Sequence, residues 1–231
     1  MDFPGLEPAA VPVDSPLHRS QRYLAAAYDS VSNLFEVTYP ALRAQRDGQR
    51  GRLTHAEHDV FRAAIVFAGA GVDAVFKEAL RSCVPIQVGR SEGAREKYLD
   101  FVTRYIQDGP EVDARKVAAL LTAPSSDEAL KASYVYKLTG SSLQSVDQVT
   151  TALSALGLQD ETALYKDARE LRGLFSVRNQ IAHELDMTPS SAKGRGARHR
   201  RERPITSYQS MSHTGLNYAQ RTLNSLQARI A

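Results

Sequence analysis

The chain contains one cysteine, Cys83, and no tryptophan among its 231 residues. A single thiol cannot form an internal disulfide and cannot supply a cysteine-based zinc site, so disulfide-rich secreted domains and zinc fingers are excluded. We therefore expect a protein of the reducing cytoplasm. Its composition, 42% hydrophobic and 24% charged residues, is that of an ordinary globular domain.

Long apolar runs are also absent. The longest, residues 63–72, is bounded by Arg62 and Asp73, and about 20 apolar residues are needed to cross a bilayer. The first 15 residues have neither a basic region nor an apolar stretch, so we expect no signal peptide and no membrane contact.

Neither sign of charge dominates, because the net charge is only +3, but the basic residues are unevenly distributed. Residues 187–206 carry a net charge of +5, with Glu202 as the only acid, and this segment is predicted to be a mobile basic loop that attracts polyanions. Its positive residues are Lys193, Arg195, Arg198, Arg200, Arg201 and Arg203. The alternative is a solvated connecting loop.

Apolar residues recur at helical spacing along most of the chain, and no strand pair or internal repeat is evident. Residues 1–15 contain three prolines and are predicted to form a flexible tail, followed by one domain over residues 16–231. Helices are expected over residues 17–42 with a break or kink at Pro40, 54–83, 98–106, 111–121, 125–138, 145–156, 160–186 and 216–230, with a loop at 85–93. The prediction is an all-α, single-domain helical bundle.

The string Gly69-Ala70-Gly71-Val72-Asp73-Ala74 matches the G-x-G-x-x-A pattern of dinucleotide-binding folds. The helical stripe nevertheless runs through both glycines without a change of period, and no alternating strands follow. We interpret the glycines as points of close approach between helices.

Two histidines, His55 and His58, lie one turn apart and could both face a metal ion. Zinc needs three or four ligands, and no further His or Cys has a matching context. We therefore predict no metal site and no cofactor, and we interpret these residues as a solvated first helical turn.

The clearest chemical signal is Arg178-Asn179-Gln180-Ile181-Ala182-His183. At about 100° per residue, Arg178 lies within the apolar stripe of its helix, whereas Asn179 and His183 lie at the edge of the stripe, one turn apart. A buried guanidinium costs several kcal/mol unless it is paired or meets an anion. The group is either a phosphate-handling site or an arginine that pairs with a neighbouring helix, for which Asp73 and Glu78 are candidate partners.

This R-N-x-x-x-H string, late in a helical chain and followed by a basic loop and one more helix, resembles the HEPN superfamily, in particular its RiboL-PSP-HEPN-like branch. The resemblance covers about residues 16–231 and implies a ribonuclease in which Arg178, Asn179 and His183 are catalytic.

In that family two protomers pair so that both motifs line one cleft. The resemblance therefore implies a homodimer with a composite active site, and RNA cleavage without a metal ion. The function expected is that of a toxin, phage-defence or RNA-processing effector, for which a neutralising partner protein is an open question. The basic loop would hold the RNA backbone. The alternative is a non-catalytic HEPN-like module that binds a nucleotide, nucleic acid or partner protein.

Overall fold

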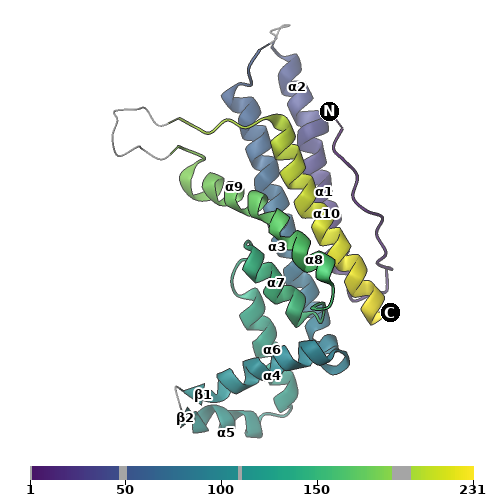
Figure 1. Cartoon of the computed structure of the whole chain (residues 1–231), viewed down its shortest axis with the longest axis vertical. Helices are drawn as coiled ribbons and strands as arrows, with labels where there is room; N and C mark the ends of the chain where they lie inside the picture. Colours follow the sequence, from purple (N-terminus) through teal and green to yellow (C-terminus); the bar gives the residue numbers. More distant parts are fainter. Residues whose placement is uncertain (1, 47–50, 109–110, 189–198) are drawn as a thin grey trace.

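A 36-residue helix, α3 (His55–Arg90), runs down the centre of the molecule, and helices from both ends of the chain pack on it (Figure 1). The computed structural model describes residues 2–46, 51–108, 111–188 and 199–231. The other elements are α1 (His18–Asn33), a π-helical turn (Leu34–Thr38), α2 (Tyr39–Ala44), α4 (Glu92–Ile106), β1 (Gln107–Asp108), β2 (Glu111–Val112), α5 (Ala114–Thr122), α6 (Ser126–Thr139), α7 (Val146–Ala155), α8 (Thr162–Asp167), a 3₁₀ turn (Ala168–Glu170), α9 (Leu171–Glu184) and α10 (Ile205–Ile230).

Helix α3 begins where the sequence predicts. The Thr54 hydroxyl accepts a hydrogen bond from the Glu57 N–H (3.2 Å), and the Glu57 carboxylate accepts one from the Thr54 N–H (2.6 Å), which is a complete capping box. The predicted end near Cys83 is wrong, because the helix continues through Pro85 to Arg90. Proline weakens a helix, but here Val84, just before Pro85, and Val88, in the turn after it, are both buried in the core.

The two glycines of α3 lie inside the helix, which rules out a strand before them and the dinucleotide-binding fold. A methyl group built on Gly71 would overlap the Cβ of Ala27 in α1. One built on Gly69 would lie 3.1 Å from the Cγ of Arg178 in α9. Both glycines therefore allow close helix packing, as predicted.

Pro40 does not end its helix. The π-helical turn Leu34–Thr38 precedes it, and α2 continues directly from Tyr39. A wider helical turn accommodates the missing proline N–H. The sequence therefore predicted a disturbance of the helix near Pro40, but not that it would be a π-helical turn.

Helices α4 to α7 form the lower part of the molecule in Figure 1. Ser125 and Ser145 cap α6 and α7 as predicted, accepting hydrogen bonds from the N–H groups of Glu128 and Gln148. The expected helix start at Glu111 is wrong, because residues 111–112 pair with residues 107–108 in a small antiparallel ladder. Asp113 then caps α5.

The predicted helix over residues 160–186 is divided into α8, a 3₁₀ turn and α9. Asp160 does not cap it, since its carboxylate accepts a hydrogen bond from Arg229 instead. The last helix, α10, begins at Ile205, well before the expected Leu216.

The N-terminal segment, for which the sequence predicts a flexible tail, packs against the helices of the bundle. Phe3 is only 4% exposed and stacks on Phe35 with ring centroids 5.3 Å apart. The N–H groups of Glu7 and Ala10 donate hydrogen bonds to Asn217 and Asn224 of α10 (2.8 and 3.0 Å). The segment runs along the edge of the molecule beside α10 (Figure 1).

One continuous hydrophobic core joins these elements, and the protein is an all-α, single-domain helical bundle, as predicted. Within the described ranges, no helix is both long enough and apolar enough to cross a membrane.

Candidate nucleic-acid site at the end of α9

Arg178 lies where α9 crosses α3. Its aliphatic stem packs against Gly69, and the side chain is half-buried. Its Nη1 donates to the side-chain oxygen Oδ1 of Asn179 (3.1 Å), and its buried Nε has no hydrogen-bond partner among the described residues. The guanidinium therefore has donor capacity that an anion can use.

The acids considered as partners of Arg178 are engaged elsewhere. Asp73 pairs with Lys77 at 3.0 Å, and Glu78 pairs with Arg19 and Arg81 at 3.4 and 3.6 Å. No ion pair of Arg178 is found within the described part of the chain. This geometry disfavours the interpretation of Arg178 as one half of a structural ion pair.

Asn179 and His183 are both exposed on α9. Arg178 and His183 are about 140° apart around the helix, so Arg178 points toward α3 while His183 faces solvent. The structure brings Arg178 and Asn179 together but does not bring Arg178 and His183 to one point.

Helix α9 ends in an unusual conformation. Leu185 and Asp186 have φ angles of 51° and 57°, and neither is a glycine. A left-handed conformation costs about 1–2 kcal/mol per non-glycine residue. The backbone is held by hydrogen bonds from the N–H groups of both residues to the Gln180 carbonyl oxygen.

The Asp186 carboxylate is fully buried and binds two arginines. Arg62 Nε of α3 donates to it at 3.0 Å, and Arg203 Nη1 donates at 2.6 Å. Arg62 also donates to Asp59 and to the Arg201 carbonyl oxygen. This buried cluster ties the end of α9 to α3 and to the residues that precede α10. The sequence does not predict this cluster, although Arg62 shows the same signal as Arg178, a charged residue beside an apolar helical stripe.

The two histidines of α3 have different environments. His55 is exposed, but His58 is buried, so the interpretation of a solvated first turn is wrong for His58. Burial lowers the pKa of His58, and the nearby Arg62 lowers it further. Among the residues that the structure describes, no group of three or more His, Cys, Asp or Glu side chains is placed to hold a metal ion.

The basic segment is only partly open to solvent. Lys193, Arg195 and Arg198 lie outside the described residues. Arg200 pairs with Asp59 (2.8 Å), Arg201 with Glu184 (3.5 Å) and Arg203 with Asp186 (2.6 Å). Part of the positive charge of these three arginines is therefore compensated within the protein, by carboxylates of α3, of α9 and of the residues that follow α9.

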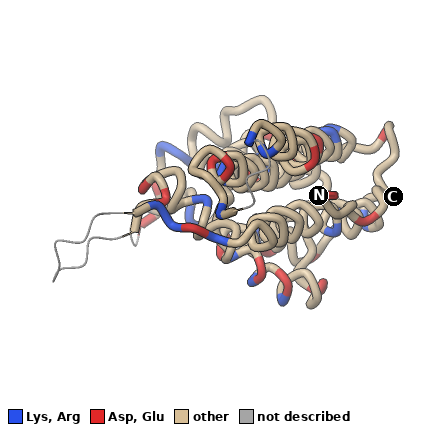
Figure 2. The backbone as a smooth tube through the Cα atoms, turned by 90° about the horizontal axis from the view of Figure 1, so that it is seen from above, with Lys and Arg blue, Asp and Glu red and all other residues tan. Residues whose placement is uncertain are grey.

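A short ladder joins the two ends of this segment. The Thr188 N–H donates to the His199 carbonyl oxygen (2.8 Å), and the Arg201 N–H donates to that of Asp186 (2.8 Å). Figure 2 shows basic and acidic residues alternating along the stretch that leads into α10. The described part of the segment, which we call the strap, is thus held by backbone hydrogen bonds to the residues after α9.

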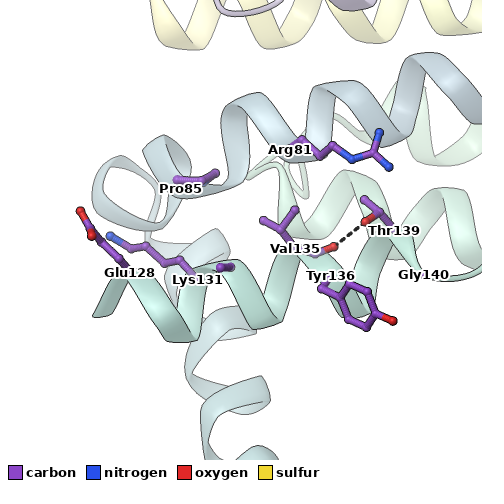
Figure 3. Close-up of a pocket in the computed structure, with 9 residues that line it drawn as sticks. Arg81, Pro85, Glu128, Lys131, Val135, Tyr136, Thr139 and Gly140 are labelled. Carbon is purple, nitrogen blue, oxygen red and sulfur yellow. Dashed lines mark hydrogen bonds between the residues drawn. The ribbon is translucent and has the colours of Figure 1, made fainter. Parts of the chain in front are cut away.

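An apolar groove lies elsewhere, between α3 and α6, and has a volume of about 610 Å³ (Figure 3). Tyr136 and Val135 line it together with three charged residues: Arg81, which pairs with Glu78, Lys131, which pairs with Asp127, and Glu128. No histidine is among its lining residues. The candidate site is therefore at α9.

No protein-family model matches the chain, and searches of curated proteins and of solved structures likewise found no match.

Proposed function

We propose that the protein is a metal-independent endoribonuclease of the HEPN type that acts as a toxin, phage-defence or RNA-processing effector. The observation that carries this proposal is the half-buried Arg178 guanidinium, which has no carboxylate partner in the described ranges. Asn179 accepts a hydrogen bond from this guanidinium, and His183 is exposed on the same helix. A cation held in place without a counter-ion is suited to a phosphate.

In this reaction one His183 imidazole removes the proton from the 2′-hydroxyl, and the 2′-oxygen attacks the adjacent phosphorus. Arg178 stabilises the negative charge on the phosphorane oxygens. A second imidazolium donates its proton to the leaving 5′-oxygen as the P–O bond breaks. The products are a 2′,3′-cyclic phosphate and a 5′-hydroxyl.

Two imidazoles are required, and each chain supplies one His183, so the proposal includes a homodimer. An apolar face of α3 next to α9 is available for that contact: Ala63, Val66, Phe67, Ala70 and Ala74 are all partly or fully exposed, and Phe67 is 49% exposed. Large exposed aromatic side chains are common at protein interfaces.

The separation of Arg178 and His183 around α9 favours the second candidate, a non-catalytic module that binds a nucleotide, nucleic acid or partner protein. Turnover distinguishes the two. Binding of RNA by the dimeric protein without cleavage between pH 6 and 8 would support the module and reject the enzyme.

The test is incubation of the purified protein with RNA in EDTA, followed by analysis of the new ends. We expect 2′,3′-cyclic phosphate ends, a loss of about 10²–10⁴-fold in rate for His183→Ala and a loss of about 10²–10³-fold for Arg178→Ala.

Arg172→Ala, at an exposed position of the same helix, and His18→Ala in α1 serve as matched controls and should cleave normally. Full activity in either motif variant, or 3′-hydroxyl ends that appear only with a divalent metal, would reject the mechanism.

A further inference from the structure

A surface pocket of about 740 Å³ lies beside the C-terminal end of α9. Three segments line it: Arg52 and His55 around the start of α3, Thr188 after α9, and residues 199–203 of the strap. Of these eight lining residues, four are arginines, two are histidines and only one, Glu202, is acidic. A pocket of this composition is suited to an anion.

The ion pairs within the protein do not neutralise all of the positive charge at the pocket. Five arginines at the pocket and directly behind it share four carboxylates, which leaves one excess positive charge before the histidines are counted. The arginines are Arg52, Arg62, Arg200, Arg201 and Arg203, and the carboxylates are those of Asp59, Glu184, Asp186 and Glu202.

The way these pairs form leaves particular donors free. Arg200 uses only Nη1, which donates to both carboxylate oxygens of Asp59 at 2.8 and 3.0 Å. Arg201 likewise uses only Nη1, toward Glu184 at 3.5 Å. Within the described part of the chain, the remaining N–H groups of both guanidiniums have no protein acceptor, and both side chains are partly exposed, 34% and 23%.

By contrast, both terminal nitrogens of Arg203 are already used in hydrogen bonds within the protein. Its Nη1 and Nη2 donate to Asp186 and to the Gln180 side-chain oxygen, at 2.6 and 2.8 Å. It forms part of the pocket wall, whereas Arg200 and Arg201 present open edges. Each of these two is held on one edge by a carboxylate, which orients the planar fork before a ligand arrives.

We propose that this pocket binds a backbone phosphate of the RNA, as a second contact point next to the α9 motif. Arg200, Arg201 and Arg52 are the binding groups, and His55 and His199 complete the wall. The pocket lies near the α9 motif, because its lining residue Arg201 contacts Glu184, the residue that follows His183. The identification of RNA as the ligand rests on the proposed function, but phosphate binding at this place does not require catalysis.

The experiment measures the binding of a fluorescent single-stranded RNA whose sugars are 2′-O-methylated, so that no 2′-hydroxyl is available for cleavage. The variant is Arg52→Gln/Arg200→Gln. Arg52 is 82% exposed and pairs only with Glu202, and Arg200 lies at the surface, so the fold should persist. The matched control, Arg95→Gln/Lys97→Gln, removes the same charge from exposed positions of α4 at the other end of α3.

We expect the Kd of the pocket variant to rise about tenfold or more near 0.1 M salt. The slope of log Kd against log salt should fall by about 1.4, which corresponds to two phosphate contacts on a single strand. The control should bind like the unchanged protein. Arg52→Gln alone, with an expected slope change of about 0.7, replaces the double variant if the latter unfolds.

An unchanged Kd and salt slope would overturn the pocket proposal, even if the protein cleaves RNA. Equal competition by polyglutamate and by RNA of the same charge would also overturn it, because the pocket would then bind any polyanion, an acidic peptide included. If the pocket variant binds more weakly but the unmodified protein never cleaves ordinary RNA, the pocket proposal stands and the proposed catalytic function fails.

Discussion

Gly69 and Gly71 are two residues apart on α3 and face different helices. Gly71 faces the Cβ of Ala27, an atom that can move only with the backbone of α1. Gly69 faces the Cγ of Arg178, which belongs to a flexible side chain. Replacement by alanine should therefore lower the stability of the fold at Gly71, and should disturb the candidate RNA site around Arg178 at Gly69.

For Gly71→Ala we expect the free energy of unfolding to fall by about 1–3 kcal/mol, because the added methyl group overpacks the α1–α3 contact. For Gly69→Ala we expect little change in stability, since a gain in helix propensity of about 1 kcal/mol offsets the displacement of the Arg178 stem. RNA cleavage or binding should nevertheless weaken. Urea denaturation and the RNA assays measure the two effects, and equal destabilisation by both variants would contradict this interpretation.

Asp186 is the buried carboxylate on which Arg62 and Arg203 converge. Asp186→Ala leaves both guanidiniums without it, and removing one partner of a buried pair typically costs about 3–5 kcal/mol. We expect a loss of this size in the free energy of unfolding, measured in urea. Glu202→Gln removes the carboxylate of an exposed pair with Arg52 and should cost at most about 1 kcal/mol. Similar losses in the two variants would mean that the buried cluster is not structural.

Among the helices, the start of α3 is linked to the end of α2 by the side chain of Glu57. Glu57 closes the capping box of α3 and also accepts hydrogen bonds from Arg43 and Arg46, at 3.2 and 2.9 Å. Burial alone would raise the pKa of Glu57, but the hydrogen bonds from the Thr54 N–H, Arg43 and Arg46 outweigh it and lower the pKa to about 2. The folded state therefore favours the ionised form.

Because the folded-state pKa is depressed, Glu57 stabilises the protein fully above its unfolded pKa near 4.5, and the contribution is lost as the pH falls toward 2. Glu57→Gln should lower the free energy of unfolding at pH 7 by roughly 2 kcal/mol. It should also flatten the decline in stability between pH 4.5 and 2. Urea titrations at several pH values give the comparison, and an unchanged slope over that interval would argue against the assignment.

Over the whole molecule, the N-terminal segment joins the beginning of the chain to its last helix. Phe3 contacts Tyr28 and Phe35 of the first helical layer, with ring centroids 5.7 and 5.3 Å apart. Gln209 of α10 donates to the Asp2 carbonyl oxygen at 2.7 Å. The segment therefore closes the bundle along one edge.

Phe3→Ala should lower the free energy of unfolding by about 3 kcal/mol, because it leaves a cavity among aromatic rings. Val13→Ala, at a position in the same segment that is 79% exposed, should change it by no more than about 0.5 kcal/mol. Thermal denaturation of the two variants is the measurement. No difference between them would indicate that the segment contributes little to stability.

The sequence alone was enough for features that depend on neighbours within a few positions. The helix starts at Thr54, Ser125 and Ser145 follow from local side-chain to backbone hydrogen bonds. The all-α class follows from helical spacing of apolar residues, and the close approach at Gly69 and Gly71 from glycines inside an unbroken stripe. The Arg178–His183 motif was located in the same way.

Only the tertiary structure decided features that depend on how separate segments of the chain come together. These include the ion pairs of Arg200 and Arg203, the separation of Arg178 from every described carboxylate, and the difference in burial between His55 and His58. The continuation of α3 past Pro85 belongs here as well, because burial of Val84 and Val88 outweighs a local preference for a break. Burial and charge pairing depend on which distant segments meet, and a local pattern carries no information about that meeting.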